Sequence, residues 1–303
     1  MCSGIIALFQ IGVGVPTNFF LLFFYLFNFF IGHRTKPIHV IYTQMNFINI
    51  MMFLSKGGSD VLTHLGMGNF MNDTGCKLVF YLHRLSLALS ICFTCYLCTF
   101  QAIIISSSVS RLGNLKAWIL DHIIHSCLFF WIFNLVIEIP VLFSMTGLRY
   151  MKNITYELNF GYCSLKNHND IYLFMITVRN VFCVVLIVCV SCYIVYLLYR
   201  HQEKVQTICS SSILARVSPE IRATKTVLLL VSAFVFCYSL TSICTICIYY
   251  FYQERFWLLS ICTTLSLCFP TVSPFILLSS GSRISLGLWA GKNSNRPATQ
   301  LPK

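Results

Sequence analysis

Seven long runs of predominantly apolar residues, separated by short polar segments, dominate the chain. A helix that spans a bilayer needs about 20 such residues, whereas strands of membrane β-barrels alternate in polarity over short segments. The unbroken runs therefore predict an all-α fold, a seven-transmembrane helix bundle, followed by a short tail over residues 281–303. The predicted spans cover residues 5–31, 38–55, 78–105, 117–143, 171–199, 226–252 and 256–280.

The composition places the chain in a membrane. Of its 303 residues, 57% are hydrophobic and only 10% are charged, and the mean hydropathy is +0.77. Charged residues make up about 25% of a soluble domain, so a soluble globular protein is excluded. No basic segment precedes the first run, which is too long for a cleaved signal peptide, and we expect it to act as a signal anchor.

Basic residues are distributed unevenly between the two sides of the predicted bundle. With the N-terminus outside, thirteen Lys and Arg residues fall in the inner segments and six in the outer segments. Inner segments of membrane proteins carry such an excess, so we predict an extracellular N-terminus and a cytoplasmic C-terminus in the plasma membrane. Topology and contact with anionic lipid account for the net charge of +12 without a nucleic-acid partner.

Two chemical features agree with this topology. The only N-glycosylation sequons begin at Asn72 and Asn153, and both lie in predicted outer segments. Most of the sixteen cysteines lie within the apolar runs, but Cys76 and Cys163 lie in outer segments. The oxidising exterior favours a disulfide between these two. Two free thiols remain the alternative, because sequence alone does not determine connectivity.

Neither catalysis nor metal binding is indicated. Cys92, Cys95 and Cys98 have a spacing that resembles iron–sulfur ligation. They lie inside an apolar run without a fourth ligand nearby, so a packing role is favoured. The chain has no HExxH motif or phosphate-binding glycine loop. We therefore expect a protein that is not an enzyme and has no cofactor. A receptor or a transporter remains, and the absence of repeated halves weighs against a transporter.

Several segments resemble the vomeronasal type-1 receptors, a rhodopsin-like family of G-protein-coupled receptors. They are "GCKLVFYLHRLSLALSICFTCYLCTFQAIIIS", "SPEIRATKTVLLLVSAFVFCYSLTSI", "CFPTVSPFILLSS" and "NITYELNFGYC". The resemblance implies a receptor of vomeronasal sensory neurons that detects pheromones or related small semiochemicals and activates a Gi/Go-type heterotrimeric G protein. A bitter-taste-type receptor is the nearest receptor alternative, but the paired outer cysteines and "SPEIRATKT" argue against it.

The chain departs from the wider rhodopsin-like pattern at its activation motifs. Phe100-Gln101-Ala102 stands where relatives carry Asp-Arg-Tyr, and Asn49 replaces an aspartate that binds sodium. Asn18 matches the asparagine of the wider family. The inner segments combine basic and apolar residues, which suits docking of a G-protein helix, although a solvated loop explains the same pattern. The candidate G-protein contacts are Gln101, Arg111, Arg216, Arg222 and Lys225.

Ionisable residues within the predicted helices indicate a binding site, because such residues usually face the bundle interior and mark function. Arg84 lies eight residues inward from Cys76, which is about 12 Å of helix. If Glu138 neutralises one arginine, the other is free to bind the sulfate, carboxylate or strong acceptor of a small apolar ligand. In the alternative interpretation these charges pair with each other and hold the helices together. The candidate ligand-binding residues are Tyr81, His83, Arg84, Leu87, Glu138 and Arg179.

Overall fold

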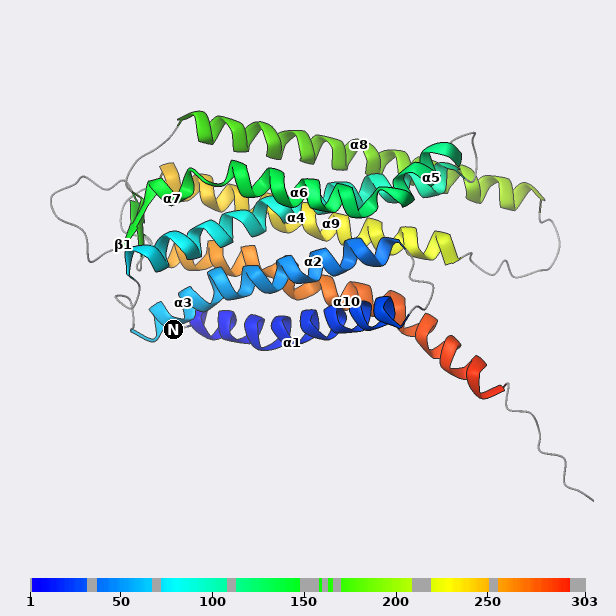
Figure 1. The fold of residues 1–303 in the computed structure, drawn as a ribbon, viewed down its shortest axis with the longest axis horizontal. Coiled ribbons are helices and arrows are strands. Elements are labelled where there is room, and N and C mark those ends of the chain that lie inside the picture. The colour runs from blue at the N-terminus through cyan, green and yellow to red at the C-terminus, as the bar shows by residue number, and fades with distance from the viewer. Residues whose placement is uncertain are drawn as a thin grey trace, which may run out of the picture.

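The protein folds into an elongated bundle of long helices (Figure 1). Its structure is a computed structural model that describes residues 2–31, 37–66, 72–107, 113–147, 158–159, 163–165, 170–208, 219–250 and 256–294. The predicted glycosylation site Asn153 and the predicted G-protein contacts Arg111 and Arg216 lie outside these ranges. Within them the chain forms ten α-helices, one π-helical turn and three short strands.

The helices follow the order of the predicted spans. Their bounds are α1 Cys2–Phe30, α2 Ile38–Met52, the π-helical turn η1 Phe53–Gly57, α3 Gly58–His64, α4 Asp73–Ser107, α5 Gly113–Asp121, α6 Ile123–Ile137, α7 Val141–Ser144, α8 Asp170–Ile208, α9 Pro219–Tyr250 and α10 Phe256–Ser294.

Six segments of the described helices are long and apolar enough to cross a membrane: Gly4–Phe30, Asp73–Ser106, Ile123–Ser144, Asp170–Arg200, Ile221–Cys247 and Leu258–Ser279. Each overlaps one predicted span. The predicted span 38–55 is not among them, because α2 has only 15 residues before the π-helical turn interrupts it. The described part of the chain is therefore that of a helical, multi-pass membrane protein.

The second predicted span differs most from the structure. Helical backbone does not end at residue 55 but continues through η1 and α3 to His64. Lys56, which the charge distribution placed in an outer segment, lies within η1 and is only 7% exposed. Its ammonium lies 3.1 Å from a carboxylate oxygen of Asp60, one turn further along. This ion pair compensates the buried charge of Lys56.

Other spans also have different bounds. The predicted span 117–143 is divided, since α5 ends at Asp121 and α6 ends at Ile137, just before Pro140. Proline lacks the N–H that a continuous helix needs at this point. The helix predicted over 78–105 begins earlier, at Asp73, and the last helix continues beyond residue 280 to Ser294.

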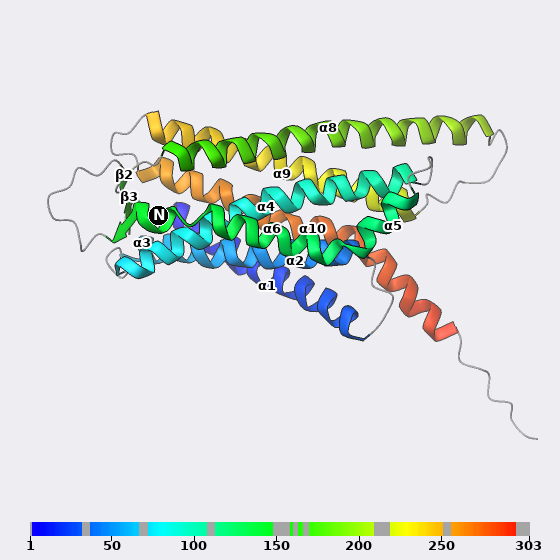
Figure 2. The same cartoon turned by 45° about the horizontal axis from the view of Figure 1, so that its top comes forward.

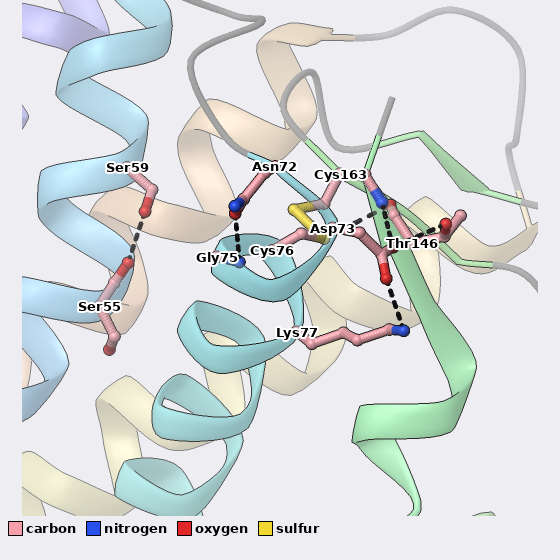
Figure 3. Close-up of a disulfide and its surroundings, with 10 residues drawn as sticks. Ser55, Ser59, Asn72, Asp73, Gly75, Cys76, Lys77, Thr146 and Cys163 are labelled. Carbon is pink, nitrogen blue, oxygen red and sulfur yellow. Dashed lines mark hydrogen bonds and ion pairs between the residues drawn. A yellow bond between two sulfur atoms is a disulfide. The ribbon is translucent and has the colours of Figure 1, made fainter. Parts of the chain in front are cut away.

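A disulfide and a small sheet close one end of the bundle, which we call the disulfide end. Strands β1 Met145–Gly147, β2 Leu158–Asn159 and β3 Cys163–Leu165 form an antiparallel sheet of order β1-β3-β2. Cys163 of β3 is bonded to Cys76 of α4, as predicted. The carboxylate of Asp73 accepts hydrogen bonds from the Thr146 hydroxyl and the Gly147 N–H, both at 3.0 Å (Figure 3).

Helix α4 is the central helix of the bundle. In its most apolar window 72% of the residues are buried, against 22–28% in the windows of α1, α6, α8 and α9. It crosses the middle of the bundle in both views and contacts α2, α6, α8 and α9 (Figures 1 and 2). Apolar side chains on the outer helices, such as Phe23, Ile132 and Val181, remain exposed. Such side chains suit a hydrocarbon environment.

Candidate ligand-binding site

A fully buried carboxylate organises the polar residues near the disulfide end. Glu138 follows the last residue of α6 and has no exposed side-chain surface. Its Oε1 lies 2.8 Å from Nη1 of Arg179, and its Oε2 accepts a hydrogen bond of 2.5 Å from the hydroxyl of Tyr172. Nε of Arg84 lies 3.6 Å from the same Oε2. A buried carboxylate requires such partners, because it has lost its hydration.

The guanidinium group of Arg179 binds residues in and directly after α6. Its side chain is 7% exposed, and Nη1 donates to Oδ1 of Asn134 at 3.1 Å as well as to Glu138. Nε donates to Oδ1 of the neighbouring Asn180 at 3.1 Å. The amide of Asn134 is itself held by the carbonyl of Phe130. The positive charge of Arg179 is therefore paired with Glu138, and its donors are directed into the protein.

Arg84 is the more accessible of the two arginines. Its side chain is 30% exposed, and its Nε donates to the Tyr172 hydroxyl at 3.3 Å. The guanidinium carbon lies 6.0 Å from the centre of the Tyr172 ring, within range of a cation–π interaction. Within the described residues, Nη1 and Nη2 of Arg84 have no hydrogen bond or ion pair. Two guanidinium groups thus share one carboxylate, and the cluster has one excess positive charge.

Tyr172 is the member of this cluster that sequence reasoning missed. Its hydroxyl donates to Glu138 and accepts from Arg84, so it links α8 to both α6 and α4. Residues seven apart on a helix lie on the same face, and Tyr172 precedes Arg179 by seven. That spacing is the one signal that connects them. It is weak, because the chain has 15 tyrosines.

A small cavity lies between the helices. Most of its wall is apolar, with hydroxyl and thiol groups at a few positions, which is typical of small-molecule sites. Tyr238, in this wall, is close enough to Arg84 to interact with it electrostatically, so the excess charge lies beside the cavity. The lining residues are Met52, Leu87, Ser90, Phe234, Cys237, Tyr238, Thr241, Leu265, Ser266, Phe269 and Pro270.

The structure brings most of the predicted ligand-binding residues together. Leu87 lines the cavity, and His83 and Arg84 lie one helical turn nearer the disulfide end of α4. Arg84, Glu138 and Arg179 form the charged cluster. Tyr81 has a different position, because its hydroxyl donates to the carbonyl of Leu135 at 2.9 Å and ties α4 to α6.

At the opposite end of the bundle, a buried hydrogen bond connects α4 to α9. Nε2 of Gln101 donates to Oγ1 of Thr224 at 2.7 Å, and these residues are 3% and 0% exposed. Arg222 and Lys225, two other candidate G-protein contacts, lie on the same part of α9 and are half-buried and exposed, respectively.

The cysteines of α4 take part in packing between helices. Sγ of Cys92 lies 3.6 Å from the Asn134 amide nitrogen, and Sγ of Cys98 lies 3.4 Å from the Ser191 hydroxyl. Within the described part of the chain, no group of three or more His, Cys, Asp or Glu residues is arranged to hold a metal ion.

Known proteins are similar to this chain over nearly its full length. The profile of the vomeronasal organ pheromone receptor family matches residues 1–290. Human vomeronasal type-1 receptor 4 is 36% identical over 274 residues, which cover 89% of this chain and 91% of the relative. Human vomeronasal type-1 receptor 3 is 35% identical over 93% of this chain and 91% of the relative. A zebrafish olfactory receptor class A-like protein 1 is 27% identical over 93% and 90%.

Proposed function

Because the chain belongs to the vomeronasal organ pheromone receptor family, we propose that it detects small semiochemicals such as pheromones and activates a Gi/Go-type heterotrimeric G protein. The family is one of chemosensory receptors, and the helices are those of a multi-pass membrane protein. The proposed location is the plasma membrane of sensory neurons in the vomeronasal organ.

The proposed receptor has seven spans, with the N-terminus outside. Six spans are supported by the long apolar helices. For the remaining one we propose the continuous helical segment from Ile38 to His64, formed by α2, η1 and α3. At 1.5 Å per residue this segment is about 40 Å long, enough to cross a bilayer. The excess of Lys and Arg in the inner segments supports an extracellular disulfide end.

The proposed ligand is a small apolar molecule with an anionic group. The observation that carries this proposal is the charge balance of the cluster, in which one carboxylate, Glu138, serves two guanidinium groups. Arg179 has the shorter contact and is buried, whereas Arg84 is partly exposed next to the cavity. A carboxylate or sulfate at Arg84 would balance the excess charge through charge-assisted hydrogen bonds.

Nucleotide exchange on a co-expressed Gi/Go-type protein tests the proposal. Small apolar acids and their methyl esters are compared at equal receptor density at the cell surface. We expect the acids to be more potent, and Arg84→Gln to reduce their potency about ten- to a hundredfold, as expected for a hydrogen bond to a charged group. Arg84→Lys keeps the charge and is the matched control. Unchanged potency of the acids in Arg84→Gln would contradict an anion site at this residue.

The G protein is proposed to bind at the end opposite the disulfide. Gln101 lies in the interior there, and Arg222 and Lys225 lie near the start of α9. Arg111 and Arg216 complete the proposed contact set. The sequon asparagines, Asn72 and Asn153, are proposed to carry glycans at the extracellular end. Asn72 is exposed directly before α4.

A further inference from the structure

Among the residues that the structure describes, a buried histidine nitrogen beside the cavity has no hydrogen-bond partner. This atom is Nδ1 of His83. His83 precedes Leu87, which lines the cavity, by four residues on α4, and Ser90 follows three residues later. Residues at these intervals lie on one face of a helix. His83 therefore lies on the cavity face of α4, one turn nearer the disulfide end. A buried polar atom without a partner costs free energy and calls for an explanation.

Two other helices place polar residues at the same level. Lys56 follows Met52, a lining residue, by four positions, and Cys262 precedes Leu265, another lining residue, by three. Lys56 interacts electrostatically with both His83 and Cys262. We call His83, Arg84, Lys56 and Cys262 the polar rim of the cavity. The deeper wall, formed by residues such as Phe234 and Phe269, is apolar.

Both cations of the polar rim have carboxylate partners. Lys56 lies 3.1 Å from Asp60, and Nε of Arg84 lies 3.6 Å from Glu138. Within the described part of the chain, Nδ1 of His83 has no hydrogen-bond partner. A neutral imidazole nitrogen either donates or accepts a hydrogen bond, depending on the tautomer. Nδ1 of His83 can therefore accept a hydrogen bond from a hydroxyl group or, in the other tautomer, donate one to a carbonyl group.

We propose that Nδ1 of His83 binds an uncharged hydroxyl or carbonyl group of the ligand, next to the anion at Arg84. This inference rests on the proposed function. Because His83 and Arg84 are adjacent and both lie in the polar rim, the two polar groups belong to one head of the ligand. The rest of the ligand is an apolar body directed toward Phe234 and Phe269.

The test compares acids that differ by one hydroxyl group. The probes are decanoate with 3-hydroxydecanoate, and 3-phenylpropionate with 2-hydroxy-3-phenylpropionate, each assayed by nucleotide exchange. In the unsubstituted receptor we expect the hydroxy acid of at least one pair to be about three- to tenfold more potent, the worth of one hydrogen bond. His83→Leu should abolish this preference. His83→Asn keeps a polar group near the position of Nδ1 and should restore part of it.

A second measurement separates ligand recognition from a structural role. If His83 supports the fold, for example by accepting from Lys56 after a side-chain rotation, His83→Leu should lower the melting temperature of the ligand-free receptor. We expect no decrease, because the leucine removes a buried atom without a partner. The matched control is His125→Leu, which makes the same change at an exposed position of α6 toward the opposite end of the bundle. It should leave potency and preference unchanged.

The outcomes distinguish the two proposals. Equal potency of both members of each pair in the unsubstituted receptor overturns the role of His83 and leaves the anion site at Arg84 standing. A hydroxyl preference that persists in His83→Leu also overturns the role of His83 and leaves the anion site at Arg84 standing. No response to any of the four acids counts against both proposals. A hydroxyl preference that disappears in His83→Leu, at an unchanged melting temperature, supports the role of His83.

Discussion

Arg179 and Glu138 form a buried ion pair, with 2.8 Å between Nη1 and Oε1, that joins α8 to α6. The side chains are 7% and 0% exposed. Burial of two charges carries a desolvation penalty that their attraction must offset. The pair therefore stabilises the arrangement of the helices only while both members are present, and it leaves Arg84 as the accessible cation.

Removal of the shared carboxylate should destabilise the receptor. Glu138→Gln leaves a buried guanidinium without its counter-charge, and loss of one partner of a buried pair costs about 3–5 kcal/mol. We expect a lower melting temperature in detergent and less receptor at the cell surface. The double variant Glu138→Gln with Arg179→Gln should recover part of the loss, because no unpaired buried charge remains at these two positions. A single variant as stable as the original would show that the pair does not support the fold.

The Tyr172 hydroxyl should position Arg84 for its ligand. Tyr172→Phe removes the hydrogen bonds to Arg84 and Glu138 but keeps the aromatic ring beside the guanidinium. We expect a loss of about three- to tenfold in potency for acidic agonists, corresponding to one net hydrogen bond. Potency of their methyl esters, measured in the same nucleotide-exchange assay, should change little. Equal losses for acids and esters would indicate a general effect on the fold instead.

The Gln101–Thr224 hydrogen bond should restrain α4 and α9 at the end opposite the disulfide. Thr224→Val removes the hydroxyl with little change in volume and leaves the buried Gln101 amide without this acceptor. If separation of these helices opens the G-protein site, ligand-independent nucleotide exchange should increase several-fold. Thr226→Val is the matched control, because it makes the same substitution two residues away and removes a hydroxyl that donates to the Arg222 carbonyl of its own helix. Unchanged basal exchange in Thr224→Val would contradict this restraint.

Asn72 should combine helix capping with glycosylation. Its Oδ1 accepts from the Gly75 N–H at 2.8 Å at the start of α4 (Figure 3). A glycan is attached to Nδ2 and leaves Oδ1 available. Asn72→Asp should remove the glycan, seen as faster migration on a gel, while the cap and the melting temperature are retained.

Thr74→Ala should have the same effect as Asn72→Asp, because it destroys only the sequon. Asn72→Ala removes the cap as well, and this should cost about 0.5–2 kcal/mol. A glycosylation pattern unchanged in Asn72→Asp would show that this sequon is not used.

The structure confirms the predicted disulfide. Its prediction needed only the hydropathy of the chain and the redox environment, and no knowledge of how the helices pack. Cys76 and Cys163 lie in predicted outer loops, so hydropathy and redox environment favoured this pair over two free thiols, and the structure shows the bond. The clustering of Arg84, Glu138 and Arg179 could also be anticipated, because charged residues within a membrane usually pair with one another. The sequence did not show which arginine Glu138 pairs with more closely. That depends on how α4, α6 and α8 are rotated about their axes.

Lys56 shows where reasoning from the sequence failed. A lysine after an apolar run predicts the end of a membrane span. In the structure, however, the helix continues through a π-helical turn, in which Lys56 is buried. The charge of Lys56 is compensated by Asp60, a contact that forms only if the backbone stays helical to that point. Hydropathy averages over a window and does not register such pairs.

The sequence by itself determined that this is a helical membrane protein and which family it resembles, and it favoured the pairing of two cysteines. These properties follow from local composition, because the cost of placing a side chain in hydrocarbon depends mainly on its own chemistry. Only the tertiary structure decided that Tyr172 bridges Arg84 and Glu138, and that Arg84 is more accessible than Arg179. It also showed that Nδ1 of His83 has no hydrogen-bond partner among the described residues. The physical reason is that these properties depend on distances between side chains of different helices, and helix rotation and packing set those distances.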